Sequence, residues 1–128
     1  MSVPEVIQTI ELQEGDSCFS EVRLDDEDGQ PVAAATLTSL TLSLYGPGGD
    51  IINNRDEVDV KNTNGGTLDP TSGEFRMDFT SDDSPILDAT LAPGDQEVHR
   101  ALFVAKWGTG KQKSWIVNIA VRQVSRLP

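Results

Sequence analysis

The stretch Leu40-Thr41-Leu42-Ser43-Leu44 decides the fold class of this chain. Three leucines alternate with small hydroxyl-bearing residues, so an extended backbone places the leucines on one face and the hydroxyls on the other. The stretch Phe75-Arg76-Met77-Asp78-Phe79 repeats this period of two with larger apolar side chains. Alternation of this kind is typical of a strand with one buried and one exposed face. The sequence therefore predicts a protein built from β-strands.

Four further segments have strand-like patterns. Residues 101–105 are apolar at every position, which predicts a central strand covered on both sides. In the other three segments, alternate residues are expected to share one face of a strand. These sets are Val6, Gln8, Ile10 and Leu12, then Ser20, Val22 and Leu24, and finally Trp115, Val117, Ile119 and Val121.

Turn-forming residues separate these segments and set the architecture. One short helical turn is predicted at residues 84–88, because Ser84 can cap it and Pro85 suits the first helical position. Nothing else has a helical pattern, and about seven short strands predict an all-β, antiparallel sandwich or barrel. The last two strands are expected to form a hairpin through residues 107–114. The turns themselves lie at residues 14–16, 28–29, 46–50, 64–66 and 108–110.

Length and composition limit the classes of protein. With 128 residues, we expect a single domain over residues 1–128, with its core at about residues 5–124. One cysteine, Cys18, excludes an intrachain disulfide, and with one histidine, His99, it excludes a Cys/His zinc centre. No apolar run approaches the roughly 20 residues of a membrane-spanning helix, and no export signal opens the chain. We therefore expect no membrane association.

Charge is divided unevenly along the chain. The formal net charge is −11, and all 21 carboxylates lie between Glu5 and Glu97. The stretch from His99 to Pro128 has six Lys and Arg residues and no acid. Either the two parts are neighbours that neutralise each other, or a dipolar molecule docks its basic side on acidic partners. So acidic a chain repels nucleic acid, which we do not expect as a partner.

An acidic run at residues 25–29 suggests a calcium loop. An EF-hand needs oxygen ligands at its first and twelfth positions. With Gly29 at the sixth position, those places are taken by Leu24 and Ala35, so the motif fails. Some β-sandwich modules bind calcium through loops between strands, and residues 82–83 would add carboxylates to such a site. The simpler interpretation is a solvated hairpin turn.

Catalytic arrangements are not evident in the sequence. A serine triad would have to use His99, and no Gly-x-Ser-x-Gly elbow is present. Cys18 is expected on an inward strand face, as a buried structural thiol rather than a partner of His99. The loop at residues 108–111 lacks the first glycine and the hydroxyl residue of a Walker motif, so it is a glycine-rich turn. We predict no enzymatic activity, no cofactor and no metal ion.

Six residues are candidates for contacts with a protein partner. Trp107 and Trp115 flank the final turn, and we expect them to lie near each other across the hairpin. Alternatively, a large aromatic side chain anchors an interface while the lysines of the same turn attract an acidic partner. The candidates are Phe19, Tyr45, Lys106, Trp107, Lys111 and Lys113.

The order of turns and strands over residues 5–124 is a further feature. Gly15-Asp16 follows the first strand, and Asp28-Gly29-Gln30-Pro31-Val32 precedes the leucine strand. Ile51-Ile52, Val58-Asp59-Val60-Lys61 and Asp69-Pro70-Thr71-Ser72-Gly73-Glu74-Phe75 then lead to a closing hairpin with Trp115. This order resembles the small immunoglobulin-like β-sandwich proteins of tailed-phage virions, namely capsid-decoration proteins, neck proteins and the attachment domain of upper-baseplate proteins. The chain departs from antibody-type domains in lacking paired cysteines.

The resemblance implies a function as well as a fold. It implies a non-enzymatic virion structural protein, either a capsid-decoration subunit or a neck (head–tail) accessory subunit. Such a protein assembles in the host cytoplasm, is located in the virion and forms a homo-oligomer or multicopy assembly. Its partners are other virion proteins, namely major capsid, portal or neck proteins. The alternatives are a carbohydrate- or receptor-binding module of a phage tail or baseplate and a calcium-dependent adhesion module.

Overall fold

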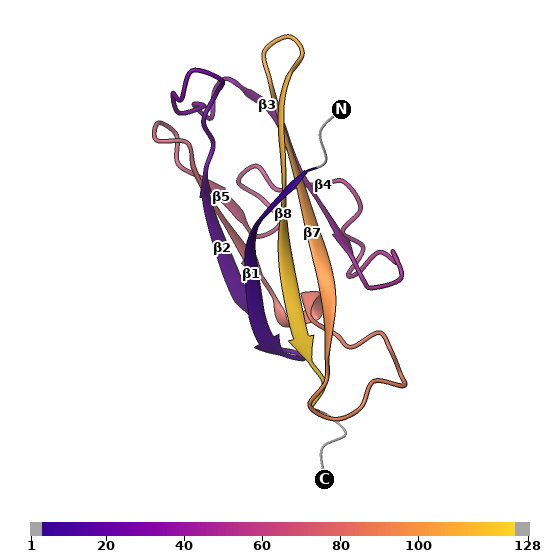
Figure 1. Ribbon diagram of the computed structural model, residues 1–128. Coiled ribbons are helices and arrows are strands. Elements are labelled where there is room, and N and C mark those ends of the chain that lie inside the picture. The colour runs from indigo at the N-terminus through magenta and orange to yellow at the C-terminus, as the bar shows by residue number, and fades with distance from the viewer. Residues whose placement is uncertain (1–3, 125–128) are drawn as a thin grey trace.

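The computed structural model describes residues 4–124, which form two stacked β-sheets (Figure 1). One sheet has five strands in the order β1-β8-β7-β3-β4, and the other has three in the order β2-β6-β5. One 3-10 turn, η1, lies in the connection between β6 and β7. The elements are β1 (Glu5–Gln13), β2 (Cys18–Arg23), β3 (Leu37–Tyr45), β4 (Val58–Asp59), β5 (Gly66–Leu68), β6 (Glu74–Phe79), η1 (Ser81–Asp83), β7 (Gln96–Trp107) and β8 (Lys111–Arg122).

The strand order is that of an immunoglobulin-like sandwich. In such a sandwich, the last two strands form a hairpin beside the third strand, and the second, fourth and fifth strands of the basic set lie in the opposite sheet. Here β8, β7 and β3 form the first group, and β2, β6 and β5 form the second. β4 adds to the outer side of β3, and β1 runs parallel to β8, while every other pairing is antiparallel. The predicted all-β, single-helical-turn architecture is confirmed.

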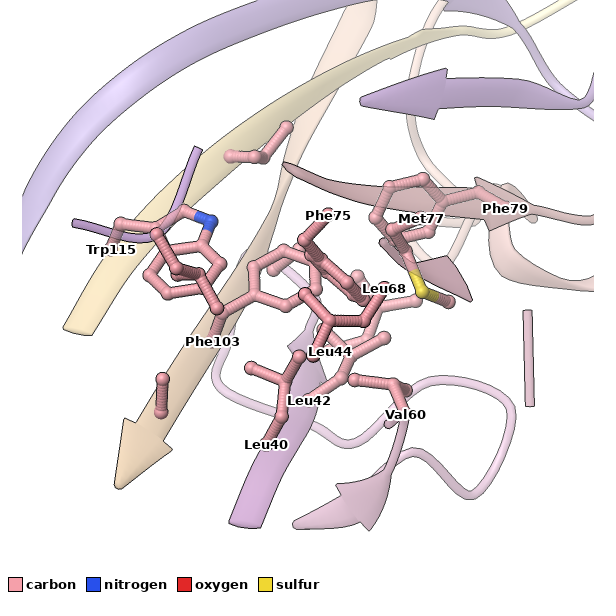
Figure 2. Packing of buried hydrophobic residues seen from close by; sticks show 14 of the residues in the cluster. Leu40, Leu42, Leu44, Val60, Leu68, Phe75, Met77, Phe79, Phe103 and Trp115 are labelled. Carbon is pink, nitrogen blue, oxygen red and sulfur yellow. The ribbon is translucent and has the colours of Figure 1, made fainter. Parts of the chain in front are cut away.

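The core lies between the two sheets (Figure 2). Leu40, Leu42 and Leu44 of β3 are completely buried, as their alternation predicts. The ring of Phe103 on β7 stacks on Trp115 of β8, with centroids 5.2 Å apart and planes inclined by 10°. Burial of each such side chain contributes roughly 1.5–3 kcal/mol to folding. The inward faces predicted for β6 and β8 are likewise confirmed.

Two local predictions were wrong. The 3-10 turn occupies Ser81–Asp83, and residues 84–88 are irregular. Proline disfavours a helical conformation in the residue before it, so Ser84 ends the turn instead of starting one. In β1, the register shifts between Val6 and Gln8, which breaks the expected alternation. Val6 therefore lies opposite the outward-pointing Ile116 and is 47% exposed.

Candidate protein-binding surfaces

The six candidate residues lie in separate parts of the molecule. Lys106, Trp107, Lys111 and Lys113 surround the β7–β8 turn. Tyr45 ends β3, beside Arg100 in the register and far along β7 from that turn. Phe19 is on β2, in the opposite sheet. The residues therefore form three surfaces instead of one site.

The tip of the β7–β8 hairpin lies against the acidic loop at residues 25–28. Lys111 Nζ is 2.5 Å from Glu27 Oε1, and this hydrogen bond lowers the pKa of Glu27 and raises that of Lys111. Lys113 lines the same hollow, which has a volume of about 520 Å³. Acidic and basic parts of the chain are thus neighbours here. Both groups are solvent-exposed, so salt weakens this pair.

The two tryptophans do not meet across the hairpin, contrary to the prediction. Trp107 lies opposite Lys111, whereas Trp115 lies opposite Phe103. Trp107 is only 7% exposed, so its ring belongs mainly to the core. The cross-strand aromatic pair is therefore Phe103 with Trp115. The pair could have been predicted from the sequence, because Phe103 and Trp115 each alternate with the other inward-facing apolar residues of their strands.

Phe19 and Tyr45 are placed differently from each other. Phe19 is 49% exposed, and the Arg76 guanidinium lies 3.9 Å from its ring centroid. This cation–π contact already covers one face of the ring. Tyr45 is half-buried beside Val98 and Arg100, in a hollow of about 310 Å³. Neither aromatic side chain is a fully exposed anchor.

The outward face of the five-stranded sheet carries apolar side chains that no second sheet covers among the described residues. Residues 101–105 of β7 were predicted to be covered on both sides, but the described residues form only two layers and cover one. Leu102 lies opposite Ile116 in the β7–β8 register, and both point away from the core. We call this surface the outer face and define it by its apolar residues, Val6, Val98, Leu102, Val104, Ile116 and Ala120.

Exposure grades across the outer face. Val98 is 43% exposed, Leu102 and Ile116 are half-buried, and Ala120 is 5% exposed. Large apolar side chains placed singly on a surface are ordinary, but Val6, Ile116 and Leu102 are register neighbours on three adjacent strands. Arg100 and Asn118 separate this group from Val98 and Ala120. The unbroken apolar run in β7 is the sequence signal for the outer face. It predicted a cover on both faces of the strand, whereas the described residues cover one.

A buried ion pair joins the loops at the opposite end from the hairpin tip. Arg55 donates from Nε to Asp83 Oδ1 over 2.6 Å and from Nη2 to Oδ2 over 3.1 Å. Asn53 Nδ2 and the backbone N–H of Thr80 also donate to this carboxylate. Burial alone raises the pKa of Asp83, but these hydrogen bonds and the charge of Arg55 outweigh it and hold the pKa below 3.8, the ordinary value.

This end of the molecule is strongly acidic. Its loops at residues 14–17, 46–57 and 80–95 meet through the Asp83 cluster and through a hydrogen bond from Gly15 N–H to the Ser84 carbonyl. Together they contain nine carboxylates, and Arg55 is their one basic residue. Nine of the chain's 21 carboxylates therefore lie in the loops at this end.

The two residues considered for nucleophilic chemistry lie in different sheets. His99 is buried on β7, with Nε2 2.6 Å from Glu97 Oε2, and Glu97 also accepts from the N–H groups of Leu87 and Asp88. Cys18 is on β2, where burial and then the charge of Asp83 raise the pKa of its thiol to about 11. A thiol that stays protonated at neutral pH is a poor nucleophile.

The acidic loop at residues 25–29 and the glycine-rich loop at residues 108–111 are turns. Asp26 Oδ1 accepts from the N–H groups of Asp28 and Gln30, each over 2.9 Å, and Gly29 has a φ of +77°. Among residues 4–124, no group of three or more acidic, cysteine or histidine side chains is placed to hold a metal ion. The Gly108–Lys111 loop joins two strands, without a following helix. The described part of the chain has no helix long and apolar enough to span a membrane.

Comparisons with known proteins add little to this description. No protein-family model and no curated protein matches the chain. Among solved structures, it is similar to the N-terminal Ig1-2 module of the Drosophila receptor protein tyrosine phosphatase DLAR, with 13% identity and a TM-score of 0.40. That match covers 98% of this chain and 48% of the other, so the chain spans about half of that module. The fold assignment rests on the strand order and not on this likeness.

Proposed function

We propose that this chain is a non-enzymatic structural protein of a tailed-phage virion, a capsid-decoration or neck (head–tail) accessory subunit that binds other virion proteins. The observation that carries the proposal is the uncovered outer face. A domain with a complete core needs no further apolar surface to fold, so an apolar face on its outside supports a role in assembly. The resemblance of the strand and turn order to virion proteins supplies the setting.

The use of the polar groups supports a binding role over catalysis. Asp83 and Glu97, two deeply buried carboxylates, are both engaged in structural hydrogen bonds within the chain. His99 contacts Glu97, and Cys18 is kept protonated by its surroundings. The acidic end adds a charged surface that attracts basic partners at long range, and contacts of this kind weaken as salt is added.

The proposal is tested by co-sedimentation with assembled particles. The chain is expected to pellet with particles at low salt, and Leu102→Lys on the outer face is expected to remove it from the pellet. Thr67→Lys on the outward face of β5 makes the same charge change on the opposite sheet and is expected to pellet normally. A wild-type chain that remains in the supernatant with every particle component would contradict the proposal.

The carbohydrate- or receptor-binding alternative has weaker support. Flat stacking of a sugar needs an open aromatic ring, and the buried Trp107 does not offer one at the hairpin tip. The ring of Phe19 is already occupied by Arg76. Glycan binding that is lost in Trp107→Ala, with the fold intact, would reverse this preference.

A further inference from the structure

We infer that a second copy of this chain covers the outer face, in a two-fold dimer whose axis runs parallel to the strands, between β7 and β8. The inference rests on the proposed function, since it names the first partner of the same surface. A two-fold axis in this position lays each β7 residue of one copy over its own β8 register partner in the other copy. The register of one chain therefore predicts the contacts of the pair.

The register is self-complementary when it is applied in this way. Leu102 meets Ile116 of the second copy and Val98 meets Ala120, so apolar side chains cover each other at the centre and toward one end. The three outward cations each meet a neutral amide, which accepts a hydrogen bond and carries no opposing charge. These cation–amide pairs are Arg100 with Asn118, Lys106 with Gln112 and Arg122 with Gln96.

The side chain of Asn118 is an independent reason to expect a hydrogen-bond donor from a second copy at the outer face. Its amide oxygen is buried beneath the outer face and has no hydrogen-bond partner among residues 4–124. An unsatisfied buried acceptor costs roughly 1–3 kcal/mol. Rotation of the amide toward the Arg100 guanidinium of a second copy would remove this cost.

Charge and area agree with a second copy. The chain has a net charge of −11, but the outward side chains of β7 and β8 include three cations and no carboxylate. Glu11 of β1 lies opposite Ala120 at the edge of this face, so it is at the centre of the face that two copies repel each other less than their net charge implies. Four strands about 4.8 Å apart and nine residues long give a face of about 19 by 30 Å, roughly 600 Å². Two such faces bury about 1,200 Å², the lower end for a specific interface.

Sedimentation equilibrium of the full chain tests the inference. Wild type is expected to move from 13.8 kDa toward twice that mass as its concentration rises to about 100 μM. Leu102→Lys and Val98→Lys are each expected to weaken dimerisation at least about tenfold, and Thr67→Lys is expected to change it less than about twofold. All variants should retain the circular-dichroism spectrum of the wild type.

Cross-linking tests the position of the axis. In a Cys18→Ser background, Arg100→Cys and Asn118→Cys chains are mixed under mild oxidation. The mixture is expected to form several times more disulfide-linked dimer than either chain alone, because each residue faces the other and not itself.

Two results would overturn the inference, and neither is the failure of particle binding. A wild-type chain that stays monomeric overturns it, as does a dimer insensitive to Leu102→Lys. If the monomer still pellets with particles and Leu102→Lys abolishes this, another virion protein covers the outer face and the proposed function stands. If the chain dimerises as described yet never binds particles, the inference stands and the proposed function fails.

Discussion

Substitution of Asp83 by asparagine should strongly destabilise the fold. Asp83 is 1% exposed, and its carboxylate receives hydrogen bonds from Arg55, Asn53 and Thr80. The asparagine is nearly the same size but removes the negative charge, which leaves the Arg55 guanidinium buried without a counterion. Breaking one side of a buried ion pair costs about 3–5 kcal/mol. For a domain of this length, this loss lowers the melting temperature by about 10–20 °C.

The assay is urea unfolding followed by the fluorescence of the two buried tryptophans, Trp107 and Trp115. Asp82→Asn is the matched control, because Asp82 is the exposed neighbour in the same 3-10 turn and should change stability by less than about 0.5 kcal/mol. Arg55→Met combined with Asp83→Asn should cost less than the sum of the two single changes. A loss below about 1 kcal/mol for Asp83→Asn would refute the reasoning.

The same pair predicts a dependence on pH. The pKa of Asp83 is lower in the folded chain than its ordinary value of 3.8, so the unfolded state takes up a proton first on acidification. The contribution of the carboxylate is therefore fully present above that ordinary value, and it is lost as pH falls through the folded-state pKa. The stability difference between wild type and Asp83→Asn should be constant near neutral pH and shrink below about pH 4.

Three further predictions concern local chemistry. Cys18, with a pKa raised to about 11 from 9.0, should react with iodoacetamide at pH 8 about a hundredfold more slowly than free cysteine, and equal rates would argue against its burial. Gly66→Ala should lower the free energy of unfolding by about 1–3 kcal/mol or more, because its Cβ would overlap the Val60 carbonyl oxygen. Gly48→Ala is the control, because the space around Gly48 is open, and equal unfolding midpoints for the two variants would contradict this packing. Chelator should leave the melting temperature unchanged, because Asp26 already serves backbone N–H groups, and a fall on chelation would restore the calcium hypothesis.

The strands of the core could be predicted because period-two alternation depends on residues close together in the sequence. Leu42 and Phe75 show this, since each lies in a run whose inward parity survives unchanged in the fold. The Arg55–Asp83 pair could not be predicted, because 28 residues separate the partners and only the sheet arrangement brings their loops together. The bulge near Val6 likewise depends on the β8 register.

The outer face shows a different limit of sequence reasoning. An unbroken apolar strand such as residues 101–105 indicates that both of its faces are covered, but it does not say by which chain. Within the described residues, the three-stranded sheet covers the inward face of β7, and no further layer covers its outward face. The apolar run therefore predicted correctly that one face of β7 is buried, and its prediction of a cover on the second face was wrong for the described residues.

The most direct measurement of the central claim is the chemical accessibility of the outer face inside an assembly. In a Cys18→Ser background, Val98→Cys and Thr67→Cys place one thiol on each outward sheet face. Maleimide should label both positions at similar rates in the dilute chain, and in assembled particles Val98→Cys should become strongly protected while Thr67→Cys reacts as before. Equal labelling of the two thiols in particles that contain the chain would contradict the claim that another subunit covers the outer face.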